Sequence, residues 1–297
     1  MKNRRALLLL AFAAILPAAQ AQTGKWPDKP VRVVVPFAPG GSNDVIARLL
    51  APRLLEEFGQ QFIVDNRGGA GGQIGATITV RANPDGYTVI IVSGSYAATP
   101  ALQKLSYDPV RDIAPVALVA DGPMIMAVHP SVKAGNLKEF IDLARATPGT
   151  IAFGSTGTGS IAHLAFERLQ QQTKTSMIHV PFSGAGPAVT ALLGGEIQFV
   201  FVSPAPAVPQ IKAGKLRALA VTGEQRWSGM PELPAVNEVI PGFSANVWFG
   251  MWAPAGTPKP IISRLNQALA RAIKQPEVQE RFRAASLEPT HSTPEEF

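Results

Sequence analysis

Short apolar runs alternate along this chain with segments whose apolar residues recur every three or four positions. Runs of four to eight apolar residues are typical of buried strands, and the three-to-four recurrence is typical of helices that cover a sheet. In the first part of the chain the pattern predicts strands at 31–35, 62–65 and 87–92 and helices at 42–58 and 73–82. Because these strands are apolar throughout rather than alternating, we expect a parallel α/β sheet with helices on both faces.

The same alternation begins again in the second part of the chain. It predicts strands at 124–128, 150–153, 178–180, 199–202, 216–221 and 248–253, and helices at 137–146, 161–171, 187–193, 205–213 and 258–273. Thr257, which is followed by a proline, is a typical cap for the last of these helices. Two α/β units indicate two lobes. We expect lobe I to contain residues 22–122 and 228–297 and lobe II to contain residues 123–227.

The first 21 residues have the three parts of a secretory signal peptide. Basic residues at positions 2, 4 and 5 precede an apolar run at 6–16, and residues 19–21 have the small-x-small form that signal peptidase cuts after. A membrane span needs about 20 apolar residues, so this run is too short to anchor the protein. We therefore expect residues 1–21 to be the signal peptide of a protein of a bacterial periplasm, with free secretion as the alternative.

Composition excludes several classes of site. The chain has no Cys, which excludes disulfides, thiolate metal sites, thiol nucleophiles and lipid attachment through Cys. The net charge of +6 falls to +3 without the three positive charges of the first 21 residues, so we expect no nucleic-acid partner. The four His residues have no metal-ligand spacing, and the chain has no Gly-x-Ser-x-Gly motif. We therefore expect no metal, no cofactor and no catalytic residue.

Two glycine-bearing turns follow strands, one in each unit. They are residues 36–44, Pro-Phe-Ala-Pro-Gly-Gly-Ser-Asn-Asp, and residues 154–160, Gly-Ser-Thr-Gly-Thr-Gly-Ser. Neither turn is a P-loop or a dinucleotide fingerprint. Each precedes a helix, where backbone N–H groups bind anions, although a plain helix cap without a ligand is the alternative. Asp44 is favoured as a cap over a ligand contact. Facing each other, the two turns would form a clamshell.

The last residues have the signature of a helix start. Thr293 is followed by Pro294 and then by two Glu residues, which suit the first turn of a helix. We expect a helix to begin here and to continue beyond Phe297, with an unstructured tail as the alternative.

Many short segments, in order along the chain, resemble one family of receptors. The segments are 27–30, 36–44, 64–72, 83–88, 107–112, 154–163, 179–182, 214–222 and 253–258, with sequences such as Pro-Phe-Ala-Pro-Gly-Gly-Ser-Asn-Asp, Asn-Pro-Asp-Gly-Tyr-Thr and Ala-Pro-Ala-Gly-Thr-Pro. Together they cover essentially the whole chain after residue 21. They are similar to the Bug family, the periplasmic substrate-binding receptors of tripartite tricarboxylate transporters.

The resemblance implies a type II periplasmic binding protein, with two α/β lobes, a two-strand hinge and a central cleft. It implies a monomer that captures a small carboxylate and delivers it to the subunits of a membrane transporter. The ligand-binding residues that it implies on lobe I are Phe37, Ala38, Gly40, Gly41, Ser42 and Asp44, with Ser93, Gly94 and Ser95 at the floor. On lobe II they are Ser155, Thr156, Gly157 and Ser160.

Two positions depart from the pattern of the family and bear on specificity. Phe182-Ser183 stands where many relatives have Tyr-Lys, and Val202 stands where many have Asp. We expect these residues to face a ligand whose distal end is apolar or aromatic, not an ammonium group. A secreted enzyme on the same lobes is the competing hypothesis, but the turns offer only Asp44 and His163 as acid or base. A ligand sensor that feeds a two-component system is a third.

Overall fold

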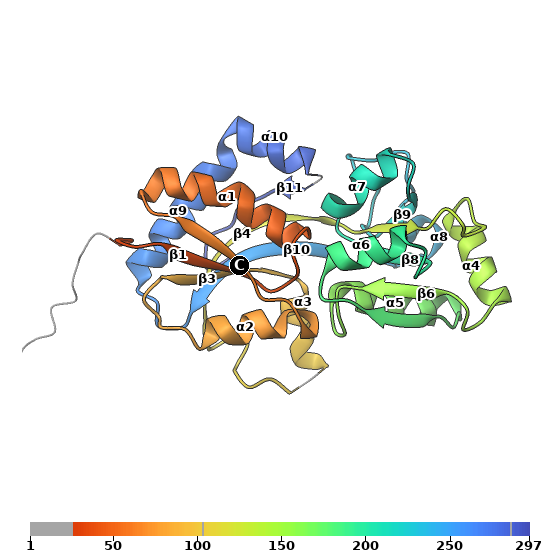
Figure 1. The fold of residues 1–297 in the computed structure, drawn as a ribbon, viewed down its shortest axis with the longest axis horizontal. Helices are drawn as coiled ribbons and strands as arrows, with labels where there is room; N and C mark the ends of the chain where they lie inside the picture. The colour runs from red at the N-terminus through yellow and green to blue at the C-terminus, as the bar shows by residue number, and fades with distance from the viewer. Residues whose placement is uncertain (1–25, 103, 286) are drawn as a thin grey trace, which may run out of the picture.

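The computed structural model describes residues 26–102, 104–285 and 287–297, so the expected signal peptide lies outside the described residues. Two lobes lie side by side along the long axis of the molecule, and each is a sheet flanked by helices (Figure 1). None of the helices within these described ranges combines the length and the apolar character needed to cross a membrane.

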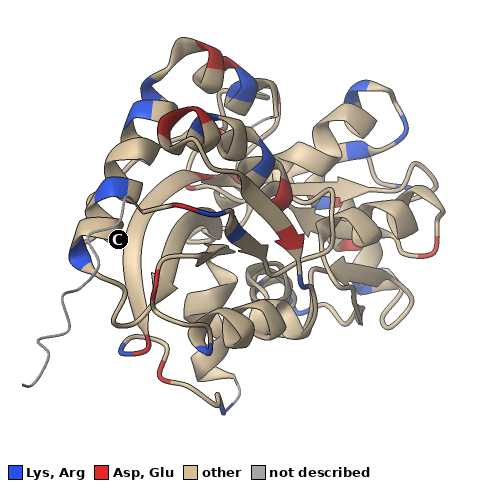
Figure 2. Cartoon of the chain, turned by 60° about the vertical axis from the view of Figure 1, so that its left-hand side comes forward, with Lys and Arg blue, Asp and Glu red and all other residues tan. Residues whose placement is uncertain are grey.

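Lobe I contains a six-stranded sheet in the order β11-β4-β10-β3-β1-β2. Its strands are β1 Val31–Val35, β2 Phe62–Asn66, β3 Thr88–Ser93, β4 Ile113–Pro123, β10 Asn246–Pro254 and β11 Glu288–Pro289. Its helices are α1 Ser42–Phe58, α2 Gln73–Val80, α3 Ser95–Ala98, α9 Lys259–Lys274 and α10 Pro276–Ala284, with 3-10 turns η1 Ala70–Gly72 and η2 Thr99–Ala101. Charged residues are concentrated on α1, α9 and α10 and at loop tips (Figure 2).

Lobe II contains a five-stranded sheet in the order β7-β6-β8-β5-β9. Its strands are β5 Ile125–Val128, β6 Ala152–Ser155, β7 Ile178–Pro181, β8 Phe199–Val202 and β9 Arg217–Val221. Its helices are α4 Leu137–Ala146, α5 Ile161–Thr173, α6 Ala185–Leu193 and α7 Pro204–Lys212, and a short helix α8 Val236–Val239 lies between β9 and β10.

The three strands that were expected to be parallel, β1, β2 and β3, are parallel, but each sheet as a whole is mixed. Strand β10 runs antiparallel to β3 and β4, and β5 runs antiparallel to β8 and β9. Each of these strands is central and covered on both faces, so its apolar run looks the same in either direction. The pattern also missed β4, an eleven-residue strand that Pro115 and Gly122 interrupt, and the helices α3 and α10.

Two expected helix caps were also wrong. The residue before α1 is Gly41, and the Asp44 carboxylate instead accepts a hydrogen bond from the N–H of Gly40, one residue before the cap. The Thr257 hydroxyl donates to the carbonyl of Pro254 and does not cap α9, whose cap position is Pro258. At Thr293 the expected helix-start bonds are present, because its Oγ1 accepts from Glu296 N–H and its own N–H donates to the Glu296 carboxylate.

The chain passes between the two sheets at two adjacent points. The first is Met124, between β4 and β5, and the second is the segment after β9 that leads to β10. Thr222 joins them: its hydroxyl accepts from Met124 N–H at 2.8 Å and donates to Ala245 O at 2.7 Å. Its backbone also bonds both Met124 and Ala245. The largest apolar core continues through this region, with buried side chains from both lobes in one cluster.

Candidate functional site

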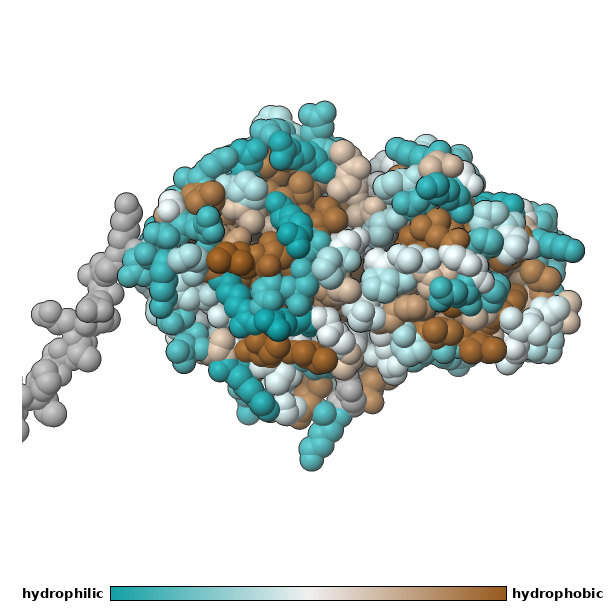
Figure 3. Space-filling model, viewed as in Figure 1, coloured by the Kyte–Doolittle hydropathy of each residue, from teal (hydrophilic) through white to brown (hydrophobic). Residues whose placement is uncertain are grey.

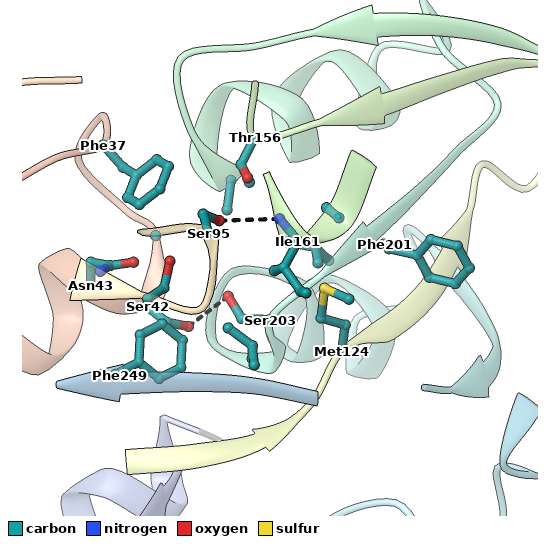
Figure 4. Close-up of a pocket in the computed structure, with 16 residues that line it drawn as sticks. Phe37, Ser42, Asn43, Ser95, Met124, Thr156, Ile161, Phe201, Ser203 and Phe249 are labelled. Atoms are coloured by element: carbon teal, nitrogen blue, oxygen red, sulfur yellow. Dashed lines mark hydrogen bonds between the residues drawn. The ribbon is translucent and has the colours of Figure 1, made fainter. Parts of the chain in front are cut away.

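A small cavity of about 40 Å³ lies where the lobes meet (Figure 4). The turns that follow β1, β3, β6 and β8 supply most of its wall, so it lies at the carboxyl ends of parallel strands in both sheets. Its lining residues are Phe37, Gly41, Ser42, Asn43, Ser93, Ser95, Met124, Thr156, Ile161, Ala162, Ala185, Phe201, Val202, Ser203, Val247 and Phe249.

Four helices begin at this cavity. The first residues of α1 and α5, Ser42 and Ile161, line it, as do Ala185 at the start of α6 and Ser203 at the cap of α7. These helices have 17, 13, 9 and 9 residues. A helix start carries about half a positive charge and unpaired N–H groups, so four of them favour an anion. Among the described residues that line the cavity, none is Asp, Glu, Lys, Arg or His.

Hydroxyl groups bridge the two lobes inside the cavity. The Ser42 hydroxyl of lobe I donates to the Ser203 hydroxyl of lobe II at 2.7 Å. The N–H of Ile161, the first of helix α5, donates to the Ser95 hydroxyl at 3.1 Å (Figure 4). These groups are the donors and acceptors that an anion between the lobes would meet. A third bridge, from Ala38 N–H to Ser183 O at 3.0 Å, lies outside the cavity lining.

Asn43 and Asp44 fix the first turn of α1. The Asn43 amide donates to Ile91 O in β3 at 2.9 Å, which ties the helix start to the sheet. Asp44 is 5% exposed and forms an ion pair with Arg48 at 3.0 Å. Burial acts to raise the pKa of Asp44, but hydrogen bonds from Arg48 and Gly40 outweigh it and hold that pKa below its usual value. Asp44 thus stabilises the turn around the cavity and does not line it.

The second turn is stabilised by a serine and two stacked histidines. Ser155 is fully buried, and its Oγ lies 2.6 Å from His179 Nε2 and also bonds the backbone of Gly157. The His179 ring stacks on His163 with centroids 4.0 Å apart. Burial, and next the neighbouring His163, lower the pKa of His179 to about 4. Ser160 caps α5 through the N–H of His163.

His179 should make folding sensitive to mild acid. Above about pH 6.5 it is neutral in both states. As the pH falls from 6.5 to 4 the unfolded chain takes up the proton first, so the free energy of unfolding decreases. After a discount for solvent screening we expect a loss on the order of 1–3 kcal/mol. Urea unfolding of the wild type and of His179→Gln at pH 7, 6, 5 and 4 measures this loss. If the free energy of unfolding fell equally with pH in the two proteins, His179 would not be the cause of the acid sensitivity.

The cavity brings together about half of the residues that the sequence pointed to. Those that line it are Phe37, Gly41, Ser42, Ser93, Ser95, Thr156 and Val202. The others lie outside it, in the turns behind or beside the lining: Ala38, Gly40, Asp44, Gly94, Ser155, Gly157, Ser160 and Phe182. Phe182 lines a separate outer groove with Pro39 and Glu196. Gly94 instead donates to Trp248 O and lies against its ring.

Sequence reasoning missed most of the apolar wall. The missed lining residues are Asn43, Met124, Ile161, Ala162, Ala185, Phe201, Ser203, Val247 and Phe249. Asn43, Ile161 and Ser203 could have been found, because each lies at the start of a helix that follows a strand. Met124, Val247 and Phe249 carry no such signal, because Met124 joins the two sheets and the other two lie within strand β10.

Glycines form the contact between the lobes beside the cavity. A Cβ on Gly71 would lie 2.6 Å from Thr158 O, and one on Gly157 would lie 2.8 Å from Gly71 N. A Cβ on Gly184 would lie 2.9 Å from Ala38 N. Where the lobes meet, much of the visible surface has near-neutral hydropathy, whereas the outer faces carry both hydrophilic and hydrophobic patches (Figure 3). The lobes approach so closely here because no side chains intervene.

Comparison with known proteins assigns the chain to a family. Residues 46–296 match the model of the tripartite tricarboxylate transporter family receptor. Protein BugT of Bordetella pertussis is 36% identical over 97% of this chain and 89% of its own length. Within the described ranges no three His, Asp or Glu residues form a group that could hold a metal ion.

Solved structures with the same fold include receptors with and without a stated ligand. The periplasmic binding protein BugD is 34% identical, with a TM-score of 0.88 over 91% of this chain and 92% of BugD. R. palustris Rpa4515 with adipate has the same identity, TM-score and coverage. The chain therefore belongs to the tripartite tricarboxylate transporter receptor family and has the two-lobe α/β fold of its periplasmic binding proteins.

Proposed function

We propose that this protein is a periplasmic receptor that captures a small carboxylate between its lobes and delivers it to a membrane transporter of the tripartite tricarboxylate type. Within this proposal, residues 1–21 are the signal peptide that exports it. The observation that carries the proposal is the convergence of four helix starts on one cavity whose described lining bears no charged side chain. Such a site attracts an anion through main-chain and hydroxyl donors.

Binding couples to closure because each lobe supplies part of the site. The starts of α5, α6 and α7 belong to lobe II, and that of α1 belongs to lobe I. A carboxylate that touches both lobes binds the closed arrangement more tightly than the open one, so it shifts the population toward closure. Closure excludes water, which strengthens the hydrogen bonds to the carboxylate. The transporter then recognises the outer faces of the closed lobes.

Geometry supports binding rather than catalysis. Ser155 and His179 are the nearest approach to a nucleophile and base, but the Ser155 side chain is fully buried and outside the cavity lining. A nucleophile needs access to its substrate. That a relative of the same fold holds adipate adds support for a carboxylate as the cargo.

A carboxylate should bind at least tenfold more tightly than the amide of the same skeleton. The reason is that helix starts and hydroxyl donors stabilise the negative charge, which an amide lacks. Calorimetry of ligand-stripped protein with acid and amide pairs, such as benzoate against benzamide and hexanoate against hexanamide, measures the ratio. Mass spectrometry of the recovered ligand and small-angle scattering with and without it are the companion measurements.

Each companion measurement addresses one part of the proposal. Recovery of the acid unchanged supports a receptor, whereas a converted product would favour the enzyme. A smaller radius of gyration with ligand supports closure. Equal affinities for acids and amides would overturn a carboxylate as the ligand class, since the amide keeps the carbon skeleton but lacks the negative charge and has N–H donors in place of one oxygen.

A further inference from the structure

The structure assigns a narrower ligand class to this cavity: an acid with a single carboxylate on an uncharged apolar body, in preference to a di- or tricarboxylate. The inference rests on the proposed function, because it takes the helix starts as the carboxylate site. It concerns the rest of the ligand, and it names Met124 and Val202 as residues that determine specificity.

Part of the cavity wall is apolar. Met124, Phe201 and Val202 come from lobe II and its junction, and Val247 and Phe249 come from β10. All five are nearly fully buried, at 4% exposure or less. In Figure 4, Met124 and Phe201 lie on the side of the cavity away from Asn43 and Phe37, beyond the bridging serines. A methylene chain or a ring that contacts these side chains loses no hydrogen bonds to them.

The change from polar to apolar lining occurs over a single peptide unit. Ser203, the cap of α7, bonds Ser42 across the lobes, while the preceding Val202 ends β8 with its side chain 1% exposed. The carboxylate end of the ligand and its apolar body are therefore held by adjacent residues. This adjacency fixes the direction in which the ligand lies.

A second carboxylate on this wall would have no counter-charge. None of the described lining residues is Lys, Arg or His, and the side chains of Met124, Val202 and Phe249 offer no N–H or O–H donor. Burying an unpaired carboxylate is strongly unfavourable. A diacid must therefore leave its second group hydrated at the mouth or forgo closure. Adipate, which Rpa4515 holds, is such a diacid, so we expect the two receptors to differ in this half of the site.

Matched acids with one or two carboxylates test the inference directly. At pH 7.5 we expect hexanoate to bind at least tenfold more tightly than adipate, and benzoate at least tenfold more tightly than terephthalate. Hexanoate and adipate share one six-carbon skeleton and differ in the second carboxylate, and terephthalate adds a second carboxylate to the ring of benzoate. Calorimetry measures both affinities, with the unfolding curve of the protein as a control for folding.

Two variants with an added positive charge test whether Met124 and Val202 determine specificity. Met124→Lys and Val202→Lys each place an ammonium group on the apolar wall, and we expect either to lower the hexanoate-to-adipate preference at least tenfold. Met124→Leu is the matched control, which should keep the ratio within about threefold. Met124→Lys has the better prospect of folding, because Lys has an unbranched stem like that of Met.

The outcomes separate this inference from the proposed function. Tighter binding of adipate and terephthalate by the wild type would overturn the single-carboxylate class and leave the receptor intact. No binding of any acid by folded protein would overturn the receptor itself. A third outcome is that the wild type binds the acids with one carboxylate more tightly while a folded Met124→Lys or Val202→Lys variant keeps the same hexanoate-to-adipate affinity ratio. That result would show that the substituted residue does not determine specificity.

Discussion

Replacement of Gly184 with Ser should weaken carboxylate binding about ten- to hundredfold without destabilising the fold. Gly184 is the cap residue of α6, at φ 164° and ψ 177°, an extended conformation that any residue adopts. Ser is a better helix cap than Gly, so the local effect on the helix is neutral or favourable. The free energy of unfolding should change by less than about 1 kcal/mol.

The loss of affinity arises across the interface between the lobes. A Cβ at position 184 would lie 2.9 Å from Ala38 N and 3.3 Å from Ala38 Cβ on the other lobe. The nearest of these atoms is backbone, so no flexible side chain can move aside. Overpacking costs about 1–3 kcal/mol, and each 1.4 kcal/mol is a factor of ten in affinity. We expect the penalty only where the lobes touch, because separation of the lobes would move Ala38 away from residue 184.

Gly194→Ser is the matched control, at the other end of the same helix. A Cβ there would meet its nearest neighbour, the Glu196 carboxylate, at 3.5 Å, which is ordinary contact. Calorimetry and scattering on both variants should show that only Gly184→Ser binds weakly and fails to compact with ligand. Wild-type affinity in folded Gly184→Ser would show that closure does not need the approach of residue 184 to Ala38.

Phe199→Ala should lower the free energy of unfolding by about 3–5 kcal/mol. Phe199 is fully buried in β8 at the centre of the lobe II sheet. Its ring lies 4.9 Å from those of Phe140 and Phe153 and about 6 Å from those of Phe166 and Phe201. Truncation leaves a cavity that these rigid rings cannot close. Urea unfolding followed by circular dichroism measures the change.

Ile178→Ala in β7 of the same sheet is the control, because Ile178 is 49% exposed. It should cost less than about 1 kcal/mol. A similar small loss for Phe199→Ala would mean that the aromatic cluster relaxes to fill the gap. Phe201 belongs to the same cluster and also lines the cavity, so the packing of lobe II supports the apolar wall of the site.

Hydrophobic periodicity determined most of the elements because each has one dominant local signal. The β-branched run of β1 and the helical spacing in α1 were both predicted at their observed positions. The family resemblance and its fold class were confirmed by the family match and the solved relatives. The lobe boundaries and the ligand contacts stay predictions. Strand β4 was not predicted, because Pro115 and Gly122 favour a loop. In the structure, pairing with β10 along the length of β4 overrides that local preference.

The sequence by itself determined the two glycine-bearing turns and the helices that follow them, and it led to the prediction of an anion site built from main-chain donors. Local rules suffice there, because a helix start exposes its N–H groups wherever it lies. Only the tertiary structure decided that four such helix starts meet in one cavity and that Met124 and Phe249 belong to the apolar wall of that cavity. It also placed Phe182 in a different groove. These facts depend on strand direction and on two crossings between the lobes, which bring together residues more than a hundred positions apart.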